Sequence, residues 1–205
     1  AFKNGQFQGH GRLEFAGGAM YEGEFTNGVI TGAGTLHYAN GDRYTGKLKY
    51  GRANGRGTLD TGSSHYDGEF KDDSYHGAGK LTDKEGNIYT GAFEKGLFHG
   101  RGVYATPDGR RYQGDFVAGN FTGAGNFLNK EGTHYDGEFE NWVFHGNGRL
   151  RDEAGDQYIG HFDHGSLEGE GEYIGKDGAH YQGGFDNGRY HGQGRLQTVE
   201  GDVYA

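Results

Sequence analysis

The chain restarts the same block about every 23 residues. Eight tyrosines mark the restarts, and each step between them is 23 residues except one step of 22 from Tyr44 to Tyr66. The eight are Tyr21, Tyr44, Tyr66, Tyr89, Tyr112, Tyr135, Tyr158 and Tyr181, and Tyr204 opens a further block. A Gly follows each of the eight by two residues, a Phe (Leu48 in one block) by four, and then comes a Gly-x-Gly pair. A fixed short period of this kind indicates an array of repeated units that complete one another's core.

The repeat also decides how the composition is interpreted. Only 32% of the 205 residues are hydrophobic and 45 are Gly, too little apolar material for a large globular core. The glycines keep fixed offsets from the aromatic residues, which argues against a flexible linker. We expect a single repeat array over residues 1–205, with a partial repeat at 1–20, repeats starting at 21, 44, 66, 89, 112, 135, 158 and 181, and a truncated start at 204. Both ends cut through the period, so we expect a fragment of a longer array.

Within a block the polar pattern predicts paired strands. Tyr135, Gly137 and Phe139 alternate with acidic residues, and the run 144–150 alternates in the same way. Alternation with period two is typical of a half-buried strand, and two such runs a few residues apart predict an antiparallel hairpin. Turn residues such as Asn187-Gly188 lie between the runs. The predicted fold class is therefore all-β: an elongated, twisted array of antiparallel β-hairpins, one for each 23 residues.

The apolar face of each predicted hairpin carries aromatic residues and glycines. Gly weakens a strand unless something must approach its backbone closely. We therefore expect aromatic rings from adjacent hairpins to lie over the glycines, so that the sheet curls around one aromatic row. At two turns Asp73 and Trp142 replace the usual Gly, which predicts a different backbone shape there.

The block resembles the MORN repeat, whose pattern is Y-x-G-x-F, then N-G, then G-x-G-x-L/Y. Tyr21–Phe25 and Tyr66–Phe70 match its core, and so do His99–Gly102 and His191–Gly194. The similarity covers essentially the whole chain. It implies a string of β-hairpins that serves as a scaffold, an adaptor or a membrane-associated module. A chain with these repeats alone is most similar to the protozoan MORN scaffold proteins, extended homodimers of cytoskeletal structures.

Our preferred hypothesis is therefore a non-enzymatic scaffold that organises a cytoskeletal or membrane-associated assembly. Its expected partners are a second copy of itself, in a tail-to-tail homodimer, and other cytoskeletal proteins. Apolar side chains near the C-terminal end are the candidates for the dimer interface: Leu167, Tyr173, Ile174, Phe185, Tyr190 and Leu196. The expected localisation is cytoplasmic, associated with the cytoskeleton and at the membrane.

Two other hypotheses belong to different functional classes. The first is a phospholipid-binding module that uses the richest basic stretch, formed by Arg43, Lys47, Lys49 and Arg52. The second is an adaptor that binds a partner helix in an aromatic groove, with Trp142 as a contact residue. The net charge of −9 lies in the C-terminal half, since residues 103–205 hold 8 Lys+Arg against 17 Asp+Glu. That charge argues against nucleic acid as a partner.

The chain lacks the residue patterns of common catalytic sites. It contains no nucleotide-binding, zinc-protease or serine-hydrolase motif, and with zero Cys it has no thiolate nucleophile. We therefore expect neither an enzyme nor a bound cofactor. For a metal we expect no site, and the weak candidates are His161, His164 and Glu168, which could gather around one hairpin turn without an evident fourth ligand.

Overall fold

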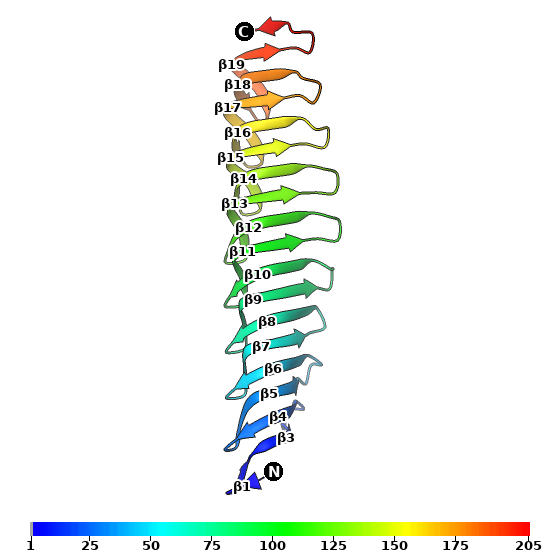
Figure 1. The fold of residues 1–205 in the computed structure, drawn as a ribbon, viewed down its shortest axis with the longest axis vertical. Helices are drawn as coiled ribbons and strands as arrows, with labels where there is room; N and C mark the ends of the chain where they lie inside the picture. The colour runs from blue at the N-terminus through cyan, green and yellow to red at the C-terminus, as the bar shows by residue number, and fades with distance from the viewer. Residues whose placement is uncertain (1) are drawn as a thin grey trace. The chain divides into compact units, whose positions relative to one another are not determined.

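The computed structural model describes residues 2–205, and these form strands and turns without any helix (Figure 1). Consequently no helix in this range is long and apolar enough to span a membrane. The chain divides into two compact units, one up to His99 and one from Gly100 onward, and each is described by itself.

The first unit contains ten strands and the start of an eleventh. They are β1 (Phe2–Lys3), β2 (Gln6–Phe7), β3 (Gly9–Glu14), β4 (Met20–Thr26), β5 (Val29–His37), β6 (Arg43–Lys49), β7 (Arg52–Asp60), β8 (Ser64–Lys71), β9 (Ser74–Asp83), β10 (Ile88–Glu94) and β11 (Leu97–Ala105), which continues into the second unit. From β3 to β10 each strand pairs with the next in antiparallel fashion.

The second unit repeats the arrangement. Its further strands are β12 (Arg111–Val117), β13 (Asn120–Leu128), β14 (His134–Glu140), β15 (Val143–Arg151), β16 (Gln157–Asp163), β17 (Ser166–Ile174), β18 (His180–Asp186), β19 (Arg189–Gln197) and β20 (Val203–Tyr204). Neighbours in the chain again pair antiparallel, from β11 to β20. The predicted all-β fold of antiparallel hairpins is therefore confirmed.

Glycines face one another across the strands of each unit. In the second unit, Gly125 pairs with Gly137, and Gly137 pairs with Gly148. A methyl group added at Gly148 would lie 2.6 Å from Cε2 of Tyr135 and closer still to the tyrosine hydroxyl. Tyr135 thus lies flat over the glycine pair of its own hairpin, whereas a ring from an adjacent hairpin was expected there. Its hydroxyl donates to the backbone oxygen of Glu138 at 3.1 Å. The glycines are required because any side chain would occupy the volume of the ring.

The aromatic row is the core of both units. Tyr66 stacks on Tyr75 with ring centroids 3.8 Å apart, and Phe93 of the following repeat covers the pair edge-on, at 5.0 Å from Tyr66. Tyr66 is 0% exposed and Phe93 is 3% exposed. Because these rings are buried, this part of the aromatic row offers no groove for the expected partner helix.

Two repeats fill the position over the glycines with a different residue. At Gly125 an added methyl group would meet the ring of Phe121, and at Gly160 it would meet Leu167. Phe121 and Leu167 are buried, whereas Tyr112 and Tyr158 of the same repeats are displaced to half-buried positions. The repeating tyrosine therefore marks the register of every hairpin, but its ring does not always fill the centre of the core.

The turns at Asp73 and Trp142 keep the backbone shape that Gly gives elsewhere. Asp73 has φ 70° and Trp142 has φ 71°, close to Gly96 at 84°, so the predicted difference in shape is wrong. A left-handed conformation costs a non-Gly residue about 1–2 kcal/mol. At Asp73 the carboxylate offsets part of that cost, since its Oδ1 accepts the N–H of Ala53 at 2.7 Å.

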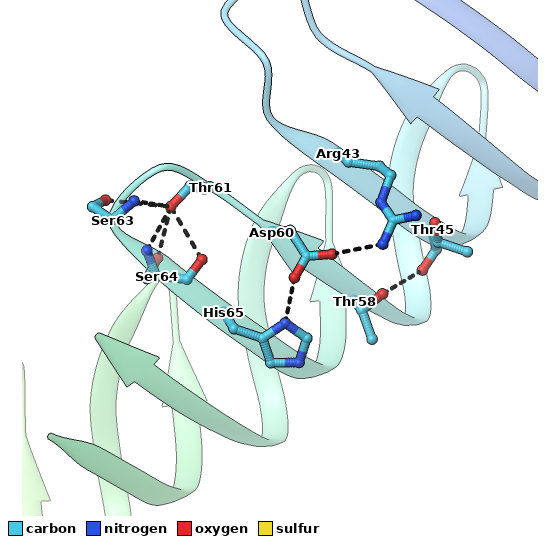
Figure 2. Close-up of polar contacts among 8 residues, drawn as sticks. All are labelled: Arg43, Thr45, Thr58, Asp60, Thr61, Ser63, Ser64 and His65. Carbon is cyan, nitrogen blue, oxygen red and sulfur yellow. Dashed lines mark hydrogen bonds and ion pairs between the residues drawn. The ribbon is translucent and has the colours of Figure 1, made fainter. Parts of the chain in front are cut away.

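The loop that is one residue shorter lies between β7 and β8 (Figure 2). Thr61 Oγ1 accepts the N–H groups of Ser63 at 3.2 Å and Ser64 at 2.9 Å, which closes the loop. Asp60 lies between His65, at 2.5 Å from Nδ1, and Arg43, at 3.2 Å. The hydrogen bond to His65 and then the one to Arg43 hold the pKa of Asp60 below its usual value.

Candidate functional site: the C-terminal surface

The outer face of the repeat 181–197 is the clearest exposed aromatic surface of the second unit. Tyr181 stacks on Tyr190 at 3.8 Å, the same stack that Tyr135 makes with Phe144 at 4.0 Å. In the inner repeat, Phe162 covers Tyr135 at 5.1 Å. Within residues 2–205 no phenylalanine of a following repeat covers the Tyr181–Tyr190 stack. Tyr190 is accordingly 47% exposed.

This exposed stack borders a groove of about 370 Å³. The groove is lined by Tyr181, Tyr190, His191, Gly192, Gly194, Leu196, Tyr204 and Ala205. We call the part formed by Tyr181, Tyr190, Leu196 and Tyr204 the C-terminal surface. Burial raises the pKa of Tyr190 to about 12, so its phenol is uncharged at neutral pH. The surface is therefore aromatic and aliphatic, with hydroxyl groups at its edges.

The backbone of β19 adds hydrogen-bonding groups to the C-terminal surface. Inner hairpins are linked by a turn N–H that donates to the preceding repeat, as from Gly165 to the carbonyl oxygen of Phe144 at 3.0 Å. Among the described residues, Tyr190 receives no such bond at its carbonyl oxygen. In addition, β20 pairs with β19 only at Leu196 and Gln197. In the described part of the chain, β19 before Leu196 has no partner strand on this side.

The structure separates the six predicted interface residues into two groups. Leu167 and Phe185 are 2% and 4% exposed, respectively, so they belong to the core and supply no interface area. Their apolar character has a structural cause, since Leu167 fills the place over Gly160. Tyr173, Ile174 and Leu196 are half-buried, and Tyr190 is exposed. Sequence reasoning missed Tyr204, which is 60% exposed, because only the start of its block is present.

The predicted basic stretch is partly neutralised by neighbouring acidic residues. Arg43 forms an ion pair with Asp60 at 3.2 Å, and Arg52 lies 3.9 Å from Asp73. Lys49 instead lies over the ring of Tyr50, with Nζ 5.7 Å from the centroid. Tyr50 was not predicted as a site residue, yet it is 76% exposed at a turn with φ 53°. The sequence did carry a signal for it, because most repeats have a short or polar residue at this turn position and this repeat has a tyrosine.

Lys47, the fourth residue of the predicted lipid site, lies on β6 opposite Ala33. Its side chain runs beside Gly55, since a methyl group added there would lie 3.3 Å from Cδ of Lys47. Lys47 and Lys49 are both exposed and project from the same face of the strand, because residues two apart in a strand share a face. All four predicted residues are therefore exposed, and the two lysines are the ones without an acidic partner among residues 2–205.

Trp142 is a packing residue. Its ring lies 5.1 Å from Tyr104, 5.2 Å from Tyr112, 5.6 Å from Phe116 and 5.8 Å from Phe121. It covers the repeat in which Phe121 has displaced Tyr112 from the centre of the core. Its ring is half-buried against these four others, and a partner contact at its remaining exposed part stays a prediction.

The weak metal candidates do not assemble into a metal site. His164 bonds to Asp163, with 2.8 Å between Nδ1 and Oδ1, and Glu168 accepts the N–H of Asn187 at 2.8 Å. His161 lies opposite Glu168 across the two strands. In residues 2–205 no group of three His, Asp or Glu side chains is arranged to hold a metal ion.

Comparisons with known proteins agree on the fold. A search of curated proteins gave no match. The TCP10 domain of Danio rerio CPAP is similar in structure, with a TM-score of 0.50 and 13% identity, over 95% of this chain and 97% of that one. A point mutant of that domain gives the same score and identity, over 95% of this chain and 96% of its own. A structure of the domain with a peptide of Danio rerio STIL has 14% identity over 96% and 92% of the two chains, with a TM-score of 0.34.

The sequence comparison identifies the family. The MORN repeat matches at residues 1–20, 21–43, 44–63, 66–88, 89–110, 135–157, 158–180 and 181–203. The gap at 111–134 is the repeat in which Phe121 takes the place of the tyrosine over the glycines. Since the matches cover most of the chain, this protein belongs to the MORN repeat family.

Proposed function

We propose that this protein is a non-enzymatic scaffold that self-associates tail to tail through its C-terminal surface and organises a cytoskeletal or membrane-associated assembly. The observation that carries the proposal is the uncovered Tyr181–Tyr190 stack, which inner repeats cover with a phenylalanine. MORN repeats commonly serve in protein-interaction scaffolds, which agrees with this role.

The physical argument for self-association combines apolar area with an open strand edge. A buried aromatic side chain contributes about 150–250 Å² of surface, and Tyr190 and Tyr204 are both substantially exposed. Two copies that meet at the same surface are related by twofold symmetry, so the assembly closes at a dimer. Antiparallel pairing of the two β19 edges would satisfy backbone groups that water now solvates.

The test is the mass of the protein in solution. Light scattering after size-exclusion chromatography should give twice 22.3 kDa for the wild-type chain at micromolar concentration. The double substitution Tyr190→Ala with Leu196→Ala should shift the mass towards one chain, while circular dichroism retains the β signal. Tyr50→Ala is the matched control, since it also removes an exposed tyrosine. A wild-type mass of one chain, or equal masses for both variants, would contradict the proposal.

A second candidate function, phospholipid binding, is favoured by the surroundings of Tyr50. This exposed tyrosine on a turn next to Lys49 could lie at the headgroup level of a bilayer, where Tyr is enriched. Vesicles with anionic phospholipid should then bind the protein, and Lys49→Glu with Tyr50→Ala should abolish the binding. Absence of sedimentation with such vesicles at low salt would exclude this candidate.

For the scaffold proposed first, the proposed setting is the cytoplasm, at the cytoskeleton.

A further inference from the structure

A second groove lies on the face of the sheet opposite to the aromatic core, in the second unit. It has a volume of about 550 Å³ and crosses five strands, from Arg101 on β11 to Asn147 on β15. Its floor is the backbone at Gly114, Gly125 and Gly137, whose missing side chains would point to the other face. The self-association proposed above does not use this groove.

The walls of this polar groove are two rows of side chains. One row contains Gln113, Asn126 and Asp136, and the other contains Glu138 and Asn147. Asp136 and Glu138 stand two residues apart on β14, so their carboxylates project from the same face. Both residues are exposed, and among residues 2–205 neither forms an ion pair with a basic side chain. The groove thus offers two carboxylates and three amides that a ligand can reach. Its one basic lining residue, Arg101, lies at the end formed by β11 and forms an ion pair with Asp115 at 3.6 Å.

Ala124 keeps the groove open. It lies on β13 opposite Glu138, and its methyl group is the smallest side chain in the walls. Other repeats carry long side chains at the same position, including Arg56 in the first unit and Gln193 in the second. Ala33 and Ala78 of the first unit also occupy this position. The backbone therefore accepts both small and large residues at this position, and in this repeat the small side chain leaves space.

The first unit contains the same pair of carboxylates in a different setting. Asp67 and Glu69 on β8 repeat the Asp-Gly-Glu sequence of residues 136–138. Lys80 lies opposite Asp67, as Arg149 lies opposite Asp136. The two settings differ at the glutamate: Arg56 lies opposite Glu69, whereas Ala124 lies opposite Glu138. Glu138 is therefore the carboxylate that lacks the basic residue of its counterpart.

We propose that this polar groove binds an extended peptide that carries lysine or arginine side chains. Five strands about 4.8 Å apart span about 19 Å, which an extended segment of about six residues matches at roughly 3.3 Å per residue. A lysine or arginine of the segment lies between Asp136 and Glu138. The amides of Gln113, Asn126 and Asn147 donate to and accept from its backbone. The second unit carries 9 Lys+Arg against 17 Asp+Glu, which steers a basic segment towards it.

The test uses fluorescein-labelled peptides of about eight residues in which threonine alternates with lysine, glutamine or glutamate. Fluorescence polarisation with the wild-type chain should show binding of the lysine peptide alone. Asp136→Asn with Glu138→Gln should weaken that binding about tenfold or more, because hydrogen bonds to charged groups are among the strongest in proteins. Ala124→Gln should weaken it similarly by filling the groove, without changing the net charge.

Two matched controls separate the groove from general attraction to an acidic protein. Asp67→Asn with Glu69→Gln changes the net charge by the same amount, and Ala78→Gln makes the same enlargement opposite Ala92. Both controls should bind the lysine peptide like the wild type. Equal weakening by both charge variants, equal binding of the lysine and glutamine peptides, full binding by Ala124→Gln, or no binding of the lysine peptide would each overturn the proposal.

Discussion

Gly148→Ala tests whether the tyrosine over the glycine pair holds a hairpin together. The new methyl group would lie 2.6 Å from Cε2 of Tyr135, and Tyr135 is 0% exposed, so the ring cannot move without disturbing its neighbours. Overpacking of a core costs about 2 kcal/mol. Displacement of the ring also breaks the hydrogen bond that its hydroxyl shares between the carbonyl oxygens of Glu138 and His145, both at 3.1 Å.

The free energy of unfolding should therefore fall by about 2 kcal/mol. The shared hydrogen bond contributes about 1 kcal/mol, and the lower entropy of the unfolded alanine chain returns about 1 kcal/mol. Urea denaturation followed by Trp142 fluorescence suits this change, because Trp142 lies at the turn between β14 and β15. If the free energy of unfolding falls by about 2 kcal/mol per molar urea, the midpoint should fall by about 1 M.

Two further variants make this reasoning refutable. Gly62→Ala places a methyl group in open space, without a left-handed backbone, and should leave the midpoint nearly unchanged. In a Tyr135→Ala background the Gly148→Ala change should cost almost nothing, because the ring it displaces is gone. Equal midpoints for Gly148→Ala and Gly62→Ala, or an undiminished cost in the Tyr135→Ala background, would refute the role of the ring.

Two other predictions concern ionisation and the aromatic cover at Trp142. Burial raises the pKa of Tyr44, Tyr89 and Tyr135 to about 12, above the usual 10. Because the folded state holds these protons more tightly than the unfolded chain, their contribution to the free energy of unfolding is complete below pH 10 and is lost as the pH rises towards 12. Absorbance at 295 nm should therefore show phenolate formation coupled to unfolding. Trp142→Gly should lower the free energy of unfolding by about 2–4 kcal/mol, since lost aromatic packing outweighs the relief of its left-handed backbone. Asp73→Gly should change it by less than about 1 kcal/mol, and denaturant titration compares the two.

The regular features of the fold could be predicted because they follow from local chemistry. The alternation around Gly137 defines a strand, and Asn187-Gly188 defines a turn, so each hairpin and its register follow from residues close in the chain. The glycines also indicated that rings approach the backbone, since close approach is one reason for Gly in a strand centre. Eight copies of the same pattern then identified the family without any long-range information.

Only the packing between hairpins decided which residue lies over the glycines in each repeat. Phe121 and Leu167 displace the repeating tyrosines over the glycines, and Trp142 closes the gap that follows from the first exchange. No local pattern distinguishes a buried Phe185 from an exposed Tyr190, because both lie on the apolar face and only a neighbouring hairpin covers one of them. The polar groove has the same origin. Its walls come from five strands, so the space beside the small side chain of Ala124 depends on how separate hairpins pair.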